Sequence, residues 1–182
     1  MLDHPEGQEL WLFGYGSLMW NPGFSHVEAH PARLFGYHRA FCIQSDSYRG
    51  TEARPGLVFG LDRGGSCRGR AYRVPAATVG ATLRYLEERE MGRGVYQPAW
   101  HRVHVCGRIE VAVCFLANRQ SRHYVGRLPF DRLVELVLQG NGARGSCFDY
   151  LASTVRQLDA LGITDWALTR LLDAARGRSG RT

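Results

Sequence analysis

The pattern of hydrophobic and polar positions divides the chain into a first part rich in strands and a last third rich in helices. The apolar run at 10–13 ends at a glycine and predicts a buried strand. Further runs of aromatic and β-branched residues, separated by Gly, Pro, Asp and Ser, predict antiparallel strands joined by short loops. These strands are expected at 34–45, 56–62, 68–74, 95–106 and 108–116. Loops are expected at 54–56 and 62–65, and Gly107 marks a turn.

Four helices are expected, one of them between the strand groups. This helix runs from about Thr78 to Met91, and Gly92 and Gly94 would end it. The other three fill the last third of the chain. Their start signals are Pro129, a capping box formed by Ser146 and Asp149, and Thr164 as an N-cap.

The order of these elements indicates an α+β fold, because strands grouped before helices are unlike the alternation of an α/β protein. We expect a loosely held lead at 1–9, one domain at 10–175 and a basic tail at 176–182. The length suits one compact domain with a sizeable core.

The absence of lysine excludes some kinds of catalysis, and the excess of basic residues does not indicate a nucleic-acid partner. All 23 basic residues are arginine, and 17 acidic residues leave a net charge of +6. Without lysine the chain cannot form a Schiff base, anchor pyridoxal phosphate or supply a P-loop lysine. The arginines are scattered, with one dense group at Arg176, Arg178 and Arg181, so the positive stripe of a nucleic-acid-binding face is missing.

The cysteine pattern and the hydropathy favour a reduced cytoplasm. Five cysteines without a C-x-x-C pair argue against a disulfide framework or a zinc knuckle. The first residues lack the charged and apolar regions of a signal peptide, and no apolar stretch is long enough to span a bilayer. We therefore expect a cytoplasmic protein with no membrane partner.

Candidate chemistry begins directly after the first strand, in the segment Gly14-Tyr15-Gly16-Ser17-Leu18-Met19. The segment lacks the third glycine and the helix of a dinucleotide-binding fingerprint, and Tyr15 and Met19 stand where a nucleophile elbow needs glycine. Two glycines around a tyrosine let backbone N–H groups approach a carboxylate or an oxyanion. A tight turn with a core tyrosine explains the same residues, so both interpretations stay open.

The helix at 78–91 carries a second candidate, Glu90. At about 100° per residue, Glu90 returns to within about 20° of Val79 and the apolar stripe, whereas Glu88 faces solvent and Glu87 lies at the edge of the stripe. A carboxylate on an apolar face is either paired with an arginine or partly desolvated with a raised pKa, which suits a general base. A last-turn glutamate that reaches back to solvent is the third possibility.

No metal site is expected. His101 and His104 lie close to Cys106 in the sequence, but on a strand the two imidazoles point to opposite faces.

Several segments together carry a family pattern. The longest is Leu12-Phe13-Gly14-Tyr15-Gly16-Ser17-Leu18-Met19-Trp20-Asn21-Pro22, and shorter ones follow in order. The shorter segments are 36–42, 49–51, 69–73, 89–91 with 94–96, and 150–151. This pattern resembles the ChaC-type γ-glutamylcyclotransferases from about residue 10 to residue 172.

The resemblance implies a small mixed or antiparallel β-barrel with flanking helices, and an enzyme that needs no cofactor. The implied reaction releases 5-oxoproline from glutathione and leaves Cys-Gly, with Glu90 as the catalytic acid and base. The resemblance places the substrate against Leu12, Phe13, Gly14, Tyr15, Gly16, Ser17, Leu18, Arg39, Tyr96 and Tyr150. Arg39 would pair a substrate carboxylate through its planar fork, or would serve as a structural partner for a buried acid.

Two alternatives to glutathione cleavage stay open at the level of sequence. A cyclotransferase for another γ-glutamyl amine or amino acid would use the same core reaction, because that reaction ignores the leaving group. A non-catalytic γ-glutamyl-binding or regulatory protein is the other alternative, and the presence of Glu90 disfavours it.

Overall fold

The computed structural model describes residues 3–180, which form two compact units. The first unit holds the described residues up to Arg39 together with Gly60–Ser121, and the second holds Ala40–Phe59 and the chain from Arg122 onward. Two long strands, β2 (Glu28–Ser45) and β3 (Gly56–Val74), contribute residues to both units.

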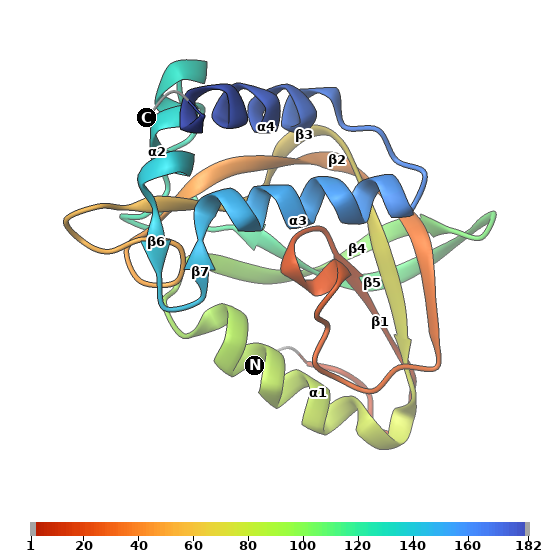
Figure 1. The fold of residues 1–182 in the computed structure, drawn as a ribbon. Helices are drawn as coiled ribbons and strands as arrows, with labels where there is room; N and C mark the ends of the chain where they lie inside the picture. Colours follow the sequence, from red (N-terminus) through yellow and green to blue (C-terminus); the bar gives the residue numbers. More distant parts are fainter. Residues whose placement is uncertain (1–2, 181–182) are drawn as a thin grey trace. The chain divides into compact units, whose positions relative to one another are not determined.

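The first unit is built on a closed five-stranded β-barrel in the order β1-β3-β2-β4-β5 (Figure 1). Besides β2 and β3, its strands are β1 (Leu10–Gly14), β4 (Tyr96–Val105) and β5 (Arg108–Ala117). β1 pairs antiparallel with β3 and parallel with β5, and this second pairing closes the barrel and makes it mixed. The expectation of an α+β protein with a small mixed barrel is therefore confirmed.

The apolar run of β1 is buried along its whole length because the strand has neighbours on both edges and side chains on both faces. Leu12 and Phe13 are fully buried, and their backbones pair with Tyr72 and Ala71 of β3. Burial on both faces explains why this strand reads as a continuous apolar run rather than as an alternation. Because the strand is buried along its length, the position of its last residue, Gly14, is fixed by the barrel.

Three strand predictions were wrong in their bounds, and the loop expected at 62–65 lies within a strand. The segments expected at 56–62 and 68–74 form the single strand β3, and β2 begins at Glu28 rather than at residue 34. Gly64 and Gly65 have φ angles of 96° and 69°, so the polar glycine pair is accommodated inside the strand instead of ending it.

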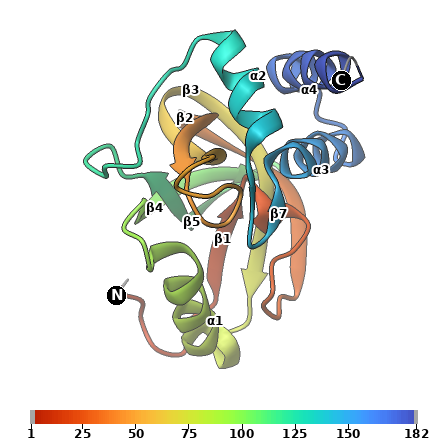
Figure 2. The same cartoon turned by 60° about the vertical axis from the view of Figure 1, so that its left-hand side comes forward.

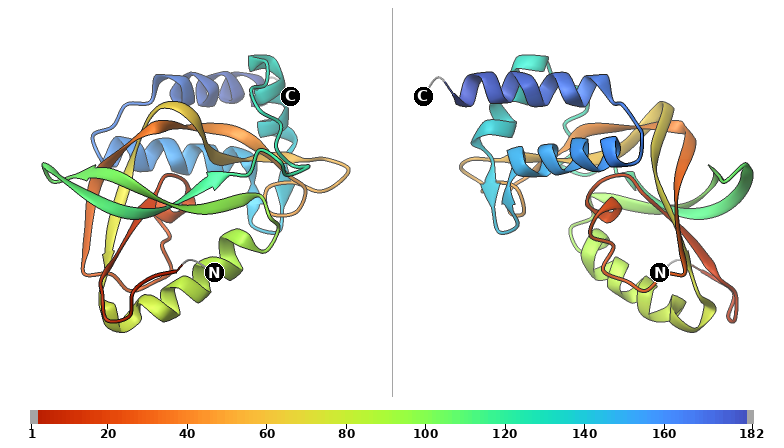
Figure 3. Two further views of the ribbon diagram at one scale, coloured as in Figure 1. Left: turned by 180° about the vertical axis from the view of Figure 1, so that it is seen from behind. Right: turned by 45° about the vertical axis from the view of Figure 1, so that its right-hand side comes forward.

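The β4–β5 hairpin has the predicted bounds to within one residue and is strongly twisted (Figure 3). Val105 pairs with Arg108, so the connection is the two-residue turn Cys106-Gly107. Both turn residues have positive φ, 49° and 74°, as a type I′ hairpin turn requires.

The helix predicted between the strand groups is present but changes type before its end. It consists of α1 (Val79–Leu86), preceded by a short 3₁₀ turn η2 (Ala76–Thr78) and continued by a π-helical turn η3 (Glu87–Met91). The π turn was not predicted, since a hydrophobic pattern over five residues does not distinguish it from an α-helical turn. It places Glu90 in the last turn before the glycines that end the helix.

The second unit contains the three helices of the last third, α2 (Phe130–Gln139), α3 (Cys147–Ala160) and α4 (Trp166–Ser179), which pack against one another (Figure 2). A two-residue hairpin, β6 (Asn141–Gly142) and β7 (Gly145–Ser146), joins α2 to α3. Helix α4 includes Arg176 and Arg178 of the expected tail, whereas Arg181 lies outside the described residues.

Two of the three predicted helix starts are confirmed. Pro129 is the N-cap of α2, and Ser146 Oγ accepts the N–H of Asp149 at 2.9 Å as the capping box requires. The third was wrong by one residue, because Asp165 caps α4 with its carboxylate on the N–H of Leu168. Thr164 lies one position too early for that contact.

Candidate functional site

The loop after β1 is held by side chains of β3 that bind its carbonyl groups. Gly14 leads into a short 3₁₀ turn, η1 (Ser17–Met19). Tyr72 Oη donates to the carbonyl oxygens of Leu18 and Met19 at 2.7 and 3.0 Å, and Arg70 Nη1 donates to that of Met19 at 3.2 Å. Burial raises the pKa of Tyr72, so its hydroxyl remains a donor.

Close contact between the loop and β3 explains why glycine stands at Gly14. A Cβ atom added there would lie 3.0 Å from the Cβ of Leu18 and 3.4 Å from a ring carbon of Tyr72. On β3, a Cβ atom at Gly69 would overlap the carbonyl oxygen of Gly14. The missing side chains therefore let the loop fold back against the barrel.

Arg39 contacts the protein backbone at this loop. Its Nε donates to the carbonyl oxygen of Tyr15 at 2.5 Å and its Nη2 to that of Arg68 at 2.5 Å. The carbonyl of one residue and the N–H of the next point in opposite directions across a trans peptide. By holding the Tyr15 carbonyl, Arg39 directs the N–H of Gly16 away from itself, where it can serve a ligand.

Tyr15 is a buried residue of the loop and not an exposed one. Its side chain is 6% exposed, and its hydroxyl donates to the carbonyl oxygen of Phe115 in β5 at 2.8 Å. This bond ties the loop to the opposite side of β1 from the β3 contacts. The core-tyrosine interpretation therefore describes the phenol ring correctly, and it is compatible with a backbone cradle on the same loop.

Glu90 is largely buried and is ion-paired. Its side chain is 15% exposed, and its Oε1 lies 3.0 Å from Nε of Arg89. Of the three alternatives for this carboxylate, the structure supports pairing with an arginine. Glu88 is exposed and Glu87 is half-buried, so the three glutamates differ as the helical phase predicted.

Arg89 connects Glu90 to the loop, and sequence reasoning gave this residue no role. Its Nη2 donates to Ser17 Oγ at 2.9 Å, while its Nη1 donates to the carbonyl oxygens of Asn21 and Pro22 at 2.7 and 3.2 Å. An arginine beside an acid on a predicted helix is usually a solvated residue, so nothing in the local pattern marked it. Its partners in the loop are more than sixty residues away in the chain.

Of the remaining predicted residues, Tyr96 belongs to the first unit and Tyr150 to the second. Tyr96 is the first residue of β4 and is half-buried. Tyr150 is 6% exposed on α3, with its ring centroid 5.2 Å from that of Phe59 and the Arg49 guanidinium 4.9 Å above it. The contacts expected between these tyrosines and a substrate stay predictions.

Within residues 3–180, no group of three or more His, Cys, Asp or Glu side chains is placed to bind a metal ion. His101 and His104 each pack against an aromatic ring of β2, at Tyr37 and Phe35. In the same part of the chain, no helix combines the length and the apolar character that crossing a membrane requires.

Known proteins with similar sequences cover most of the chain. Residues 10–178 match the family described as ChaC-like protein. The glutathione-specific gamma-glutamylcyclotransferase of Escherichia coli (strain K12) is 36% identical over 92% of this chain and 73% of its own length. The glutathione-specific gamma-glutamylcyclotransferase 1 of Homo sapiens is 32% identical over 79% of this chain and 67% of its own length.

The fold agrees with a solved structure. The crystal structure of a gamma-glutamyl cyclotransferase specific to glutathione from yeast superposes with a TM-score of 0.86. The match covers 93% of this chain and 96% of the yeast chain at 22% identity. At this identity the superposition bears on the fold alone.

Proposed function

Because the chain belongs to the ChaC-like family of glutathione-specific γ-glutamylcyclotransferases, we propose that it cleaves glutathione into 5-oxoproline and Cys-Gly. The match to the family covers the whole barrel, α2, α3 and all but the last residue of α4. The similarity to the enzymes of Escherichia coli and Homo sapiens supports this substrate over other γ-glutamyl compounds.

The proposed reaction is an intramolecular transfer that needs a base, an acid and a carbonyl-activating group. The α-amine of the γ-glutamyl residue attacks its own γ-carbonyl carbon, forming the lactam C–N bond and breaking the C–N bond to cysteine. One proton moves from the attacking amine to the leaving amine. The enzyme therefore has to fold the γ-glutamyl chain, carry this proton and stabilise the oxyanion.

Glu90 is the group that we assign to the proton. The family match carries this assignment, since pairing with an arginine does not by itself indicate a base. A carboxylate must be ionised to accept the proton from the amine. The same carboxyl group then protonates the leaving amine of cysteine. The low exposure of Glu90 limits competition from water for this proton.

The backbone from Gly14 to Leu18 is proposed to hold the γ-glutamyl carboxylate or the oxyanion through its N–H groups. Arg39 supports this role indirectly, because it orients the peptide between Tyr15 and Gly16. Leu12 and Phe13 fix the start of the loop from the barrel core. Ser17, Tyr96 and Tyr150 remain proposed substrate contacts.

One observation carries the proposal: a single arginine joins the candidate base to the candidate cradle, since Arg89 contacts both Glu90 and Ser17. Residues 17 and 90 come from different elements, and the contacts of Arg89 bring both to the same guanidinium group. A cytoplasmic setting, inferred from the cysteine usage, would supply glutathione in its reduced form.

Replacement of the proposed base tests the function. Glu90→Gln keeps the size and burial of the side chain but cannot accept the proton, so 5-oxoproline release from glutathione should fall a hundredfold or more. The measurement is the rate of 5-oxoproline formation by purified protein of verified folding. Full turnover by Glu90→Gln would contradict the assignment of Glu90 as the base.

Glu88→Gln serves as the matched control, since Glu88 lies two residues before Glu90 and is exposed, so its replacement should leave turnover unchanged. Parallel assays with γ-glutamyl amines and γ-glutamyl amino acids test the substrate class. Calorimetric binding of glutathione without product over hours would favour a binding protein instead.

A further inference from the structure

We infer that Arg89 is a positioning residue of the active site, which sets the place of Glu90 relative to the substrate-binding loop. The inference rests on the proposed function, because it takes Glu90 as the acid and base and the loop as the cradle. It concerns a residue of the helix end that contacts both parts and need not touch substrate itself.

The contacts of Arg89 involve every nitrogen atom of its planar guanidinium group. Nε contacts Glu90 at 3.0 Å, Nη2 contacts Ser17 Oγ at 2.9 Å, and Nη1 contacts Tyr85 Oη at 2.7 Å. The same Nη1 also reaches the carbonyl oxygens of Asn21 and Pro22. All three nitrogen atoms are thus engaged, and they bind acceptors from the helix, the 3₁₀ turn and the loop that follows it.

Burial makes this arrangement specific. The Arg89 side chain is 7% exposed, so its charge is satisfied by these partners rather than by bulk water. A buried guanidinium that lost one acceptor would keep a costly unsatisfied N–H, which favours the arrangement in which all partners are in place. The position of Glu90 is therefore coupled to that of the loop.

The π turn supports the same conclusion. A π turn adds one residue relative to an α-helical turn, and such insertions occur frequently at functional sites. Here the π turn contains Arg89 and Glu90, so it sets how these two neighbouring side chains leave the helix end. In this turn, the Arg89 side chain reaches the loop, and the Glu90 carboxylate lies beside the Arg89 guanidinium group.

Removal of Arg89 should have one effect if the residue is only structural and another if it positions Glu90. Loss of a structural contact lowers the amount or the stability of folded protein without changing turnover per folded molecule. Loss of positioning lowers kcat, since a displacement of about 1 Å at a reacting group can cost roughly a hundredfold in rate. Arg39, Arg70 and Tyr72 would still hold the backbone of the loop. Binding of glutathione should therefore be affected less, and KM should change little.

The test compares Arg89→Ala with Arg84→Ala, an exposed arginine on the same helix. Arg89→Ala is expected to lose roughly a hundredfold in kcat with KM within about threefold. Guanidinium ion at tens of millimolar should restore part of the lost rate by filling the vacated site, whereas sodium chloride at equal ionic strength should not. Arg84→Ala should behave like the parent protein in both salts.

Arg89→Lys keeps the charge but loses the planar fork, and it tests the inference if Arg89→Ala does not fold. Its kcat should also fall more than tenfold. A folded Arg89→Lys or Arg89→Ala protein with kcat within about threefold of the parent would overturn the inference, as would a rise in KM at unchanged kcat.

Failure of the proposed function would be recognised separately. Absence of 5-oxoproline release from the unmodified protein would count against that function alone. The coupling between Arg89 and Glu90 is then tested by a measurement that does not depend on turnover. The midpoints of urea unfolding are compared for Arg89→Lys, Glu90→Gln and the double variant. Additive changes in midpoint would contradict the coupling, and non-additive changes would support it.

Discussion

The five cysteines of the chain have very different environments. Cys42, Cys67, Cys114 and Cys147 are buried, whereas Cys106 is exposed in the β4–β5 turn. Burial raises the pKa of the Cys147 thiol to about 12, and it also raises that of Cys114. Since the thiolate is the reactive form, exposure separates Cys106 from the other four, and the raised pKa values further disfavour reaction at Cys114 and Cys147.

We therefore predict that iodoacetamide at pH 8 labels one thiol per folded chain, and that this thiol is Cys106. Intact-mass measurement over time should show a single rapid addition, and Cys106→Ser should abolish it. Unfolding in urea should expose all five thiols to the reagent. Rapid labelling of a second site in the folded protein would contradict the burial of the other four.

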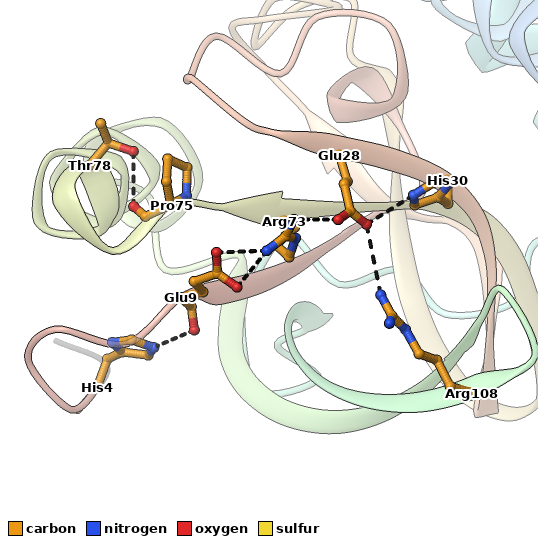
Figure 4. A network of polar contacts seen from close by, with 8 residues as sticks. All are labelled: His4, Glu9, Glu28, His30, Arg73, Pro75, Thr78 and Arg108. Atoms are coloured by element: carbon orange, nitrogen blue, oxygen red, sulfur yellow. Dashed lines mark hydrogen bonds and ion pairs between the residues drawn. The ribbon is translucent and has the colours of Figure 1, made fainter.

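At the scale of elements, a charged network outside the barrel core joins β2 and β3 to Glu9, the residue before β1 (Figure 4). Glu28 contacts His30 at 3.1 Å and is ion-paired with Arg73, which also binds Glu9. The hydrogen bond from His30, together with the bond and charge of Arg73, holds the pKa of Glu28 below its usual value. The pair with Arg73 spans neighbouring strands of the barrel.

A lowered pKa in the folded state gives this carboxylate a defined pH dependence. Its contribution to stability is present above the unfolded pKa, near 4.5, and is lost as the pH falls through the lower folded value. Glu28→Gln should therefore lower the urea midpoint at pH 7, and the difference from the parent should shrink as the pH falls below about 4.5. A difference that persisted unchanged at pH 3 would show that the charge is not its source.

Glu52→Gln provides the comparison for this series. Glu52 is exposed, and its replacement should change the midpoint little at any pH. Because Glu28 itself is partly exposed, added salt should reduce the Glu28→Gln effect at neutral pH.

At the scale of the whole molecule, the net charge of +6 bears on the capture of substrate. Glutathione is an anion at neutral pH, so an excess of arginine can raise its rate of encounter with the protein. Several arginines are already committed to internal contacts, as Arg39, Arg70 and Arg89 show. The assistance to capture should therefore be modest.

We predict that kcat/KM for glutathione falls as sodium chloride is raised from low to physiological ionic strength, while kcat stays nearly constant. Initial rates of 5-oxoproline release at several salt concentrations provide the measurement. If kcat/KM did not change with ionic strength, the excess of arginine would have no role in substrate capture and would be a compositional bias.

The sequence by itself determined the features that depend on neighbours along the chain. Alternation, turn residues and caps predicted most strands and all four helices, because these signals act within a few residues. The same local reasoning found the loop at Gly14–Leu18 and the inward direction of Glu90. It failed for the glycine pair inside β3 and for the π turn, since neighbouring strands and packing decide whether such residues continue an element.

Only the tertiary structure decided which partners the polar groups of the site have. Arg39 binds the backbone carbonyl groups of Tyr15 and Arg68, Tyr15 is anchored to β5, and Arg89 joins Glu90 to the loop. A buried donor binds whichever acceptor the fold brings within reach, and these acceptors lie far away in the sequence. The order of residues thus indicated which groups are candidates for the chemistry, while the closing of the barrel decided how these groups are held.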